Sequence, residues 1–339
     1  MKRVLVLVGQ GARPPRSLEG LSDAQVSEWK MEYDVLAALE ALGYEPRTVE
    51  VSYDLNRIRD AVEEHKPHVV FNMLEDFHGH VVFDQNVVAY LELLRVPFTG
   101  CNPRGLVLSR DKALTKKVCA YHRIPTPRFQ VCLRGRKVRR LKKGVEFPLI
   151  VKSLREDASV GISQASIVHD LEQLNKRATF IHETVGDDAI AEEYIEGREL
   201  YLGVLGNLRL ETFPLWELDL DELPEGAPRI ATERIKWNLE YQKKYKIKSG
   251  PAQGISEKEL ARVARLSKRV FRLLSLSGYA RLDWRMRPDG RLYLLEANAN
   301  PDLSSDEDYA LSAEAHGLSY HALIQRILNL GVRYHATWD

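Results

Sequence analysis

The sequence has few cysteines, no long apolar run and almost no net charge. Its three cysteines, Cys101, Cys119 and Cys132, form no C-x-x-C pair. This argues against a disulfide framework or a structural zinc site and is typical of a reducing, cytoplasmic location. No run approaches the roughly 18 apolar residues that a membrane span needs. Forty-nine Lys and Arg against forty-eight Asp and Glu leave a net charge of +1, so the molecule as a whole presents no basic field to nucleic acid.

The composition is that of a globular protein with more than one domain. The 339 residues are 44% hydrophobic and 29% charged, a balance found in folded chains, and the length predicts two or three domains. Strand-like runs at 4–8, 45–51 and 68–74 alternate with helical patterns at 22–42 and 55–65. This alternation predicts a doubly wound parallel α/β sheet at the N-terminus.

The pattern is less regular further along the chain. Ser109 is expected to cap a helix that runs to about His122. Residues 212–252 hold four prolines and many charges and are expected to form an irregular insert over the substrate side of a cleft. We place the domain boundaries near residues 105 and 190.

The most informative segment is an expected β-hairpin near the C-terminus. Asp289-Gly290 is a strong signal for a two-residue turn. Pairing the chain around that turn places Asp283 opposite Glu296 and Arg281 opposite Asn298. Because side chains alternate across a strand, these four residues share one face of the hairpin.

Two interpretations of this face stay open. Each carboxylate can pair with its own arginine or with water, which makes the face structural. Alternatively, the two carboxylates and the Asn298 carbonyl form a magnesium site, since Mg²⁺ prefers one or two carboxylates together with substrate phosphates. Arg281 on the same face then suits an oxyanion.

These residues carry a resemblance to a known family. Arg281-Leu-Asp283 and Leu-Leu-Glu296-Ala-Asn298-Ala-Asn-Pro301 resemble the metal-binding end of the ATP-grasp ligases, and more closely the D-alanine–D-alanine ligase family. The resemblance covers about residues 1–330. Further motifs of that family occur in the same order as in the family: Pro97-Phe-Thr-Gly100, Ser109-Arg-Asp-Lys112, Pro148-Leu-Ile-Val-Lys152, Arg155-Glu-Asp-Ala-Ser-Val-Gly161, and Glu192-Glu-Tyr-Ile195 with Gly197 and Glu199.

The resemblance implies a two-subdomain ATP-grasp fold behind the N-terminal parallel sheet. Residues 1–105 are then an N-terminal α/β domain. Residues 106–190 form a central ATP-grasp subdomain with the phosphate loop, and residues 191–339 a C-terminal subdomain with the metal site. The resemblance also implies a homodimer.

The resemblance also assigns roles to individual residues. Lys112 and Lys152 hold ATP phosphates as point charges, and the loop 155–161 closes over these phosphates. Glu192 accepts a hydrogen bond from the adenine amino group. Glu199 accepts hydrogen bonds from ribose hydroxyls. Arg281 stabilises a tetrahedral oxyanion. The full sets are Arg281, Lys236 and Ser159 for catalysis; Lys112, Lys152, Glu192, Glu193, Tyr194, Ile195 and Glu199 for ATP; and Asp283, Glu296 and Asn298 for Mg²⁺ or Mn²⁺.

The implied reaction has two steps. A substrate carboxylate attacks the γ-phosphate of ATP and forms an acyl phosphate and ADP. An amine then attacks the acyl carbon, phosphate leaves and an amide forms. The site must exclude water, because acyl phosphates hydrolyse readily.

The substrate pocket departs from the family. The loop 9–15 lacks the family's glutamate, Ala158 stands where the family has serine, and Trp237 stands where it has tyrosine. His78-Gly79 matches the family, but Phe83 replaces the glutamate that follows. The sequence therefore predicts ATP chemistry of the family type without its dipeptide recognition.

The loop 302–308 departs most. It normally receives the second substrate's carboxylate, yet here it carries four acidic residues. We expect an acceptor that is basic or lacks a nearby carboxylate, although a solvated acidic turn is an equal alternative. The candidate substrate residues are His78, Trp237, Asp302, Asp306 and Glu307.

Four functions remain open. The leading one is an ATP-dependent carboxylate–amine ligase with small-molecule substrates other than D-alanine. The others are a true D-alanine–D-alanine ligase with a divergent pocket, a nucleotide-binding regulator without ligase activity, and a ligase that uses residues 134–143 to hold nucleic acid or an anionic carrier. That stretch has seven Lys or Arg in ten positions, but no interleaved aromatic, which favours a solvated hairpin over a nucleic-acid surface.

Overall fold

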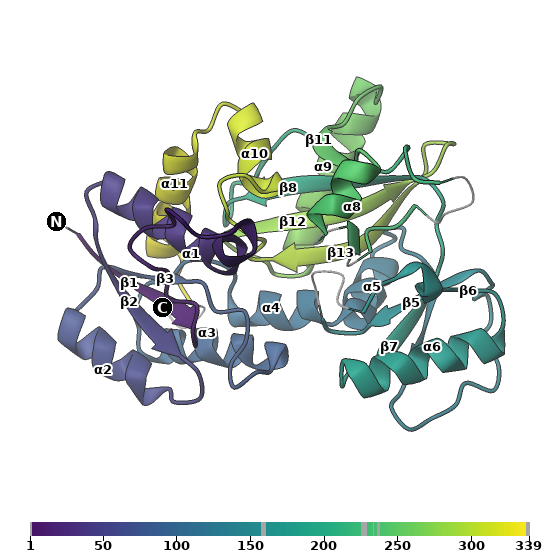
Figure 1. Cartoon of the computed structure of the whole chain (residues 1–339), viewed down its shortest axis with the longest axis horizontal. Helices are drawn as coiled ribbons and strands as arrows, with labels where there is room; N and C mark the ends of the chain where they lie inside the picture. The colour runs from purple at the N-terminus through teal and green to yellow at the C-terminus, as the bar shows by residue number, and fades with distance from the viewer. Residues whose placement is uncertain (1, 157–160, 225–228, 233, 236–237, 337–339) are drawn as a thin grey trace.

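The computed structural model describes residues 2–156, 161–224, 229–232, 234–235 and 238–336. These residues form three sheets, of three, six and four strands. In Figure 1 the three-stranded sheet lies at the left, the six-stranded sheet at the upper right and the four-stranded sheet at the lower right. The predicted α/β class is confirmed, with a parallel sheet at the N-terminus and antiparallel sheets after it.

The N-terminal sheet is buried on both faces because helices cover each side. Its strands are parallel in the order β2-β1-β3. Val4, Val6 and Val8 of β1 face one hydrophobic cluster, while Leu5 and Leu7 face another. The elements are β1 (Arg3–Gly9), α1 (Asp23–Ala41), β2 (Glu45–Val51), α2 (Asn56–His65), β3 (Val69–Asn72) and α3 (Asp84–Leu93).

The two antiparallel sheets follow. The four-stranded sheet has the order β4-β7-β5-β6, and the six-stranded sheet has the order β11-β10-β8-β12-β13 with β9 paired to β8. Their strands are β4 (Phe129–Cys132), β5 (Leu149–Ser153), β6 (Ile167–Val168), β7 (Ala189–Glu193), β8 (Arg198–Leu205), β9 (Glu211–Thr212), β10 (Trp216–Asp219), β11 (Lys248–Pro251), β12 (Tyr279–Met286) and β13 (Leu292–Ala299).

This order corrects two expectations. The segment 134–143 is not the turn of a hairpin, because β7 lies between β4 and β5. The insert 212–252 is not wholly irregular, because it supplies β10 and β11 to the six-stranded sheet and also forms α8 (Leu239–Lys244).

The predicted start of a helix at Ser109 is also wrong. The chain forms α4 (Pro103–Arg110) and then α5 (Lys112–Tyr121), with an extended residue, Asp111, between them. The Asp111 carboxylate accepts from Leu114 N and caps α5, while the Ser109 hydroxyl donates to Gly105 O inside α4. The remaining helices are α6 (Leu171–Thr184), α9 (Glu257–Leu273), α10 (Asp308–Ala315) and α11 (Tyr320–Val332).

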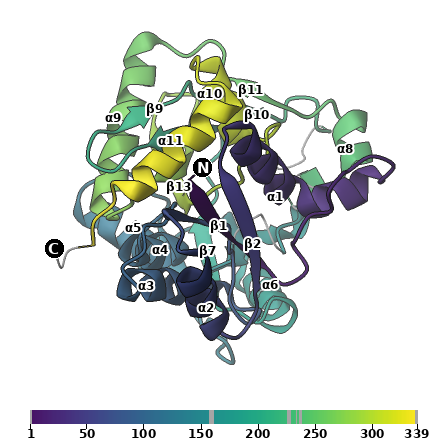
Figure 2. The same cartoon turned by 90° about the vertical axis from the view of Figure 1, so that its left-hand side faces the viewer.

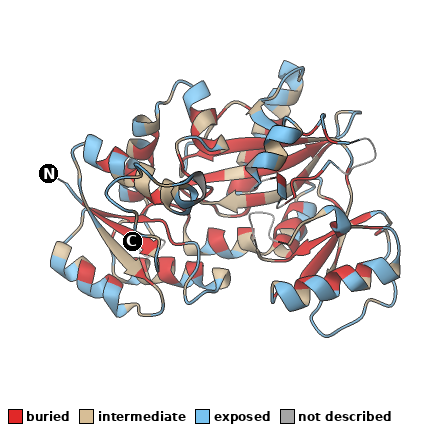
Figure 3. Cartoon of the chain, viewed as in Figure 1, coloured by how far each residue is buried: buried red, intermediate tan, exposed pale blue. Residues whose placement is uncertain are grey.

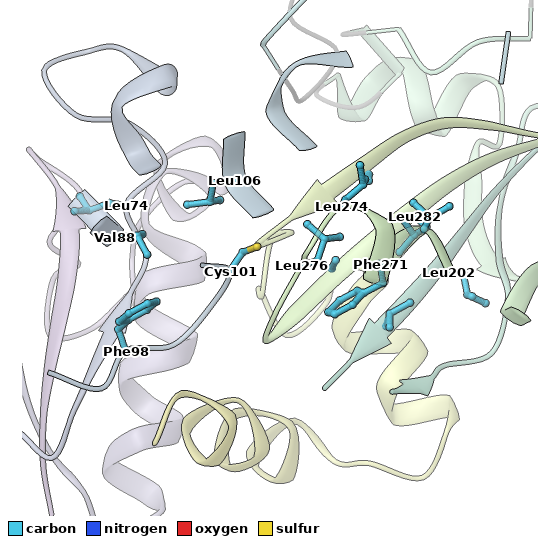
Figure 4. Close-up of a cluster of buried hydrophobic side chains, with 14 of the residues drawn as sticks. Leu74, Val88, Phe98, Cys101, Leu106, Leu202, Phe271, Leu274, Leu276 and Leu282 are labelled. Atoms are coloured by element: carbon cyan, nitrogen blue, oxygen red, sulfur yellow. The ribbon is translucent and has the colours of Figure 1, made fainter. Parts of the chain in front are cut away.

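One hydrophobic cluster joins the N-terminal sheet to the six-stranded sheet. Figure 4 shows Leu74, Val88 and Phe98 on one side, Phe271 and Leu282 on the other, and Cys101 between them. Burial raises the pKa of the Cys101 thiol to about 12, so this cysteine packs as a small hydrophobe.

The C-terminal helix returns to the N-terminal sheet. In Figure 2, α11 lies next to α1, and both helices pack over β1 and β3 in one cluster. Figure 3 shows the resulting pattern of buried strands and helices with exposed outer faces. None of the helices within the described ranges is long and apolar enough to cross a membrane.

Candidate active site

The hairpin β12–β13 has the predicted register at the site. Asp283 pairs with Glu296 and Arg281 pairs with Asn298. Successive pairs two residues apart place all four side chains on one face of the sheet. The face on which the metal-site interpretation depends is therefore present.

The turn of this hairpin differs from the prediction. Arg287 N donates to Arg291 O, and Met286 pairs with Leu292, so the turn has three residues instead of two. Gly290 adopts a φ of +76°, the left-handed conformation that such a turn requires. A bulge between Asp283 and Trp284 then leaves Leu295 as the extra residue on β13 and restores the predicted register.

A buried lysine holds this bulge. Lys116 of α5 is fully buried, and its ammonium donates to Leu295 O. The same ammonium lies 3.2 Å from the Glu192 carboxylate. Burial lowers the pKa of Lys116, and attraction to Glu192 offsets part of this effect. Lys116 thus ties the central helix to the strand that carries Glu296.

The acidic face is well connected. Arg281 donates from Nε and Nη2 to the two Asp283 oxygens, at 2.9 Å each, and Asn298 Nδ2 donates to Asp283 Oδ2 at 2.9 Å. Burial opposes the charge on Arg281, but attraction to Asp283 outweighs it and raises the pKa of the guanidinium. Lys112 Nζ lies 3.7 Å from Glu296 Oε2.

The donor set suits a metal that also binds phosphate. Asp283 is buried and Glu296 is part-buried, and the Asn298 amide lies beside them. Among the residues with assigned positions, no group of three or more His, Cys, Asp or Glu side chains could hold a metal ion. Two carboxylates and an amide match Mg²⁺, which relies on substrate phosphates for its other ligands.

One cavity brings the predicted phosphate lysines to the acidic face. Lys112 at the start of α5 and Lys152 on β5 are both buried, and Lys112 Nζ donates to Glu156 O at 2.6 Å. Glu199 and both carboxylates of the hairpin contribute to the same cavity. Its lining residues are Lys112, Ile150, Lys152, Ser153, Glu156, Ile162, Glu199, Ile230, Ala231, Asp283, Arg285, Leu295 and Glu296.

Glu192 lies behind this cavity. It is 1% exposed, and its carboxylate lies 3.2 Å from Lys116 Nζ and 3.2 Å from Lys152 Nζ. Glu192 therefore fixes Lys152 in the arrangement described, and its contact with adenine remains a prediction. Glu193, Tyr194 and Ile195 follow on and after β7, outside the cavity lining, so their roles also remain predictions.

Sequence reasoning missed two residues beside Glu199. Arg285 donates to Glu199 Oε2 at 2.6 Å, and Tyr201 OH donates to Glu199 Oε1 at 3.0 Å. The Tyr201 ring also lies under the Arg281 guanidinium, 4.6 Å from its centroid. The signal was present, since Arg285 continues the alternate positions of Arg281 and Asp283 on β12.

The other predicted site residues are placed as follows. Ser159, Lys236 and Trp237 lie outside the described residues. His78 lies on an exposed turn with a φ of +59°, and its ring is 6.2 Å from that of Tyr53. It does not line the cavity.

The acidic loop faces helix α1. Asp302 accepts from Ser304 N and Oγ, at 2.7 Å each, and Asp306 pairs with Lys30 of α1 at 3.3 Å. Partial desolvation and repulsion from Asp302 and Asp308 raise the pKa of Glu307 to about 7, although Glu307 itself stays exposed.

A further carboxylate, Glu32 of α1, was not anticipated. It is 8% exposed, and within the described ranges no cation pairs with it. Burial, with repulsion from Glu75 and Asp302, raises its pKa to about 7. Glu32 brings a charge from the N-terminal domain toward the same loop.

Glu32→Gln is expected to stabilise the protein at pH 8 but hardly at pH 5. The folded-state pKa of Glu32 lies above the ordinary value near 4.5. Ionisation of Glu32 therefore lowers the free energy of unfolding progressively between about pH 4.5 and pH 7, and by a constant amount at higher pH. Removing the charge should raise the free energy of unfolding by about 2 kcal/mol at pH 8. Denaturant unfolding at both pH values measures this, and Glu28→Gln on the exposed face of α1 is the control. Equal stability of Glu32→Gln and wild type at pH 8 would contradict the assignment.

The comparisons with known proteins agree with this geometry. A family model described as the D-ala D-ala ligase C-terminus matches residues 119–329. The uncharacterised protein y4sG of Sinorhizobium fredii is 35% identical over 267 residues, 78% of this chain and 75% of that protein. A D-alanine–D-alanine ligase of Bordetella petrii is 32% identical over 257 residues, 74% of this chain and 73% of that protein.

A solved structure shows the same fold. The crystal structure of D-alanine–D-alanine ligase from Bacillus anthracis complexed with ATP matches with a TM-score of 0.72 and 23% identity, over 98% of each chain. The fold and the lysine- and carboxylate-lined cavity define an ATP-grasp enzyme. The chain belongs to the D-alanine–D-alanine ligase family, and it is an ATP-dependent, ADP-forming ligase.

Proposed function

We propose that this protein joins a small-molecule carboxylate to an amine through an acyl phosphate, and that its substrates are not two molecules of D-alanine. The observation that carries the proposal is the single cavity lined by Lys112, Lys152, Asp283 and Glu296. Two buried cations and two carboxylates at one cavity suit a nucleotide triphosphate with Mg²⁺ or Mn²⁺.

The residues of the chain have distinct parts in this reaction. Lys112 and Lys152 bind the phosphates, and Asp283, Glu296 and Asn298 would hold Mg²⁺, which supplies charge neutralisation at the transferred phosphoryl group. Arg281 is fixed by Asp283 and Tyr201, which preorganises its guanidinium for the oxyanion formed when the amine attacks the acyl carbon.

The acidic loop supports a basic acceptor. Burial, with added repulsion from neighbouring carboxylates, raises the pKa of Glu307 and of Glu32 to about 7. A positively charged acceptor would relieve that repulsion, whereas an acceptor carboxylate would add to it. This favours an amine substrate with a second positive charge near the loop 302–308.

The alternative is that this protein joins two molecules of D-alanine, and the relatives named D-alanine–D-alanine ligase support it. A phosphate-release screen with ATP and Mg²⁺ separates the two functions. Pairs of carboxylates and amines, including amino acids, short peptides and polyamines, are compared with D-alanine alone. We expect turnover that depends on a basic amine. Robust turnover with D-alanine alone would overturn the substrate proposal, and no turnover with any pair would favour a nucleotide-binding regulator.

Glu307→Gln is expected to raise the Michaelis constant of the basic acceptor about tenfold, the usual effect of losing one charged hydrogen bond. Asp306→Asn is the matched control, because Asp306 already pairs with Lys30, which also binds Asp34. Steady-state kinetics of both variants, with ATP saturating, measure the difference. An unchanged constant in Glu307→Gln would make the loop a solvated acidic turn.

We further propose domain boundaries near residues 105 and 190, a homodimer, a cytoplasmic location, and substrate contacts by His78 and Trp237. The segment 134–143 is exposed at its basic positions, and the absence of interleaved aromatics there favours a solvated surface over a nucleic-acid site.

A further inference from the structure

The carboxylate of Glu199 is held from both sides. Tyr201 and Arg285 each donate to a different Glu199 oxygen, at 3.0 Å and 2.6 Å. All three residues are more than nine-tenths buried. Each carboxylate oxygen has two lone pairs, so each keeps one position free to accept a hydrogen bond from a ligand in the cavity.

The strand register explains this geometry. Arg285 of β12 lies directly opposite Glu199 of β8, and Asp283 lies opposite Tyr201. Because cross-strand neighbours on one face lie close together, the Arg285 side chain can contact the Glu199 carboxylate directly. The pairing is a property of the two strands rather than of a loop.

Arg285 also fixes the wall of the cavity. Its Nη1 donates to Gly197 O at 3.0 Å and to Arg229 O at 2.9 Å. Ile230 and Ala231, next to Arg229, line the cavity together with Glu199 and Arg285. One guanidinium therefore orders both the Glu199 carboxylate and the adjoining backbone segment.

We infer that Arg285 and Tyr201 are positioning residues that aim the Glu199 carboxylate at the sugar of the nucleotide, so that the cavity distinguishes ribose from deoxyribose. The inference rests on the proposed function, because it requires the nucleotide to occupy this cavity. A carboxylate fixed in this way accepts from sugar hydroxyls without a cost of reorganisation.

Calorimetric binding of AMP-PNP and 2′-deoxy-AMP-PNP, each with Mg²⁺, tests the inference without turnover. Wild type should bind the ribose form about tenfold more tightly, the value of one hydrogen bond to a charged group. Arg285→Met should reduce this ratio to about twofold or less, and Arg285→Lys should restore part of it.

Tyr201→Phe provides a second variant that keeps the fold. It removes only the hydroxyl that donates to Glu199 and leaves the ring under Arg281, so the ratio should fall. This separates positioning of Glu199 from support of Arg281.

Arg198→Met is the matched control. Arg198 donates to the Glu217 carboxylate, with Nε at 2.6 Å, and to Gln253 O at 2.6 Å, so it makes a similar set of bonds in the same sheet but does not line the cavity. Its loss should destabilise the fold without changing the ratio of the two affinities.

Two outcomes would overturn the inference alone. One is binding of both nucleotides by wild type with equal affinity. The other is an unchanged ratio in both Arg285→Met and Tyr201→Phe. Absence of AMP-PNP binding to wild type would contradict the proposed function as well, so the two failures are distinguishable.

Discussion

Glu296→Gln is expected to lower ATP turnover about a hundredfold or more while the fold stays intact. Glu296 and Asp283 face each other across the hairpin, and Lys112 approaches Glu296 at 3.7 Å. Glutamine keeps the shape but removes one of the two negative charges that balance the metal. ADP formation with the substrate pair found in the screen measures the loss, and thermal unfolding checks the fold.

Glu314→Gln is the control for this variant. Glu314 is exposed on α10, so the same chemical change there should leave turnover unaltered. Near-normal turnover of Glu296→Gln would show that the hairpin face is structural, with each carboxylate satisfied by its own cation.

Arg281→Lys should lower the rate of the chemical step about a hundredfold and change nucleotide affinity by less than about twofold. Lysine keeps the positive charge but loses the planar fork that donates twice to Asp283. It also loses the flat contact with the Tyr201 ring. Losing a preorganised oxyanion donor typically costs about 10²–10³ in rate.

Single-turnover kinetics and nucleotide binding separate the two effects. Arg269→Lys, on the exposed side of α9, where Arg269 donates to His122 O, is the control and should change neither quantity. A weaker nucleotide affinity with an unchanged maximal rate would show that Arg281 binds the nucleotide in the ground state and does not stabilise the transition state.

The register of the metal-site face was predictable because side chains alternate with a period of two. A two-residue turn at Asp289-Gly290 places Asp283 opposite Glu296, and the three-residue turn reaches the same pairing only through the bulge at Leu295. The turn itself was not predictable from Asp289-Gly290, because the bulge at Leu295 absorbs one residue. The bulge depends on Lys116, which belongs to a helix far away in the sequence.

Buried charges were the least predictable part of the site. Lys116 and Glu192 look like solvated positions in the sequence, yet they pair inside the protein beside Lys152. Glu32 looks like an ordinary residue of an amphipathic helix, and its exposure depends on how α1 packs against the C-terminal segments. Such contacts follow from the tertiary fold and leave no local pattern.

The strands β10 and β11 were missed for a related reason. Each has four residues, and Pro251 ends β11, so neither shows enough alternation to stand out among prolines and charges. The pairing of β10 with β8, and of β11 with β10, supplies the structure that their own sequence does not specify.

The most direct test of the account is the fate of oxygen in the carboxylate substrate. With that carboxylate labelled with ¹⁸O, attack on the γ-phosphate forms a carbon–oxygen–phosphorus bridge, and the amine then breaks the carbon–oxygen bond. Mass spectrometry of the released phosphate should find one ¹⁸O atom per phosphate, in amounts equal to the amide and ADP formed. Phosphate that contains no ¹⁸O would contradict the acyl-phosphate ligase mechanism.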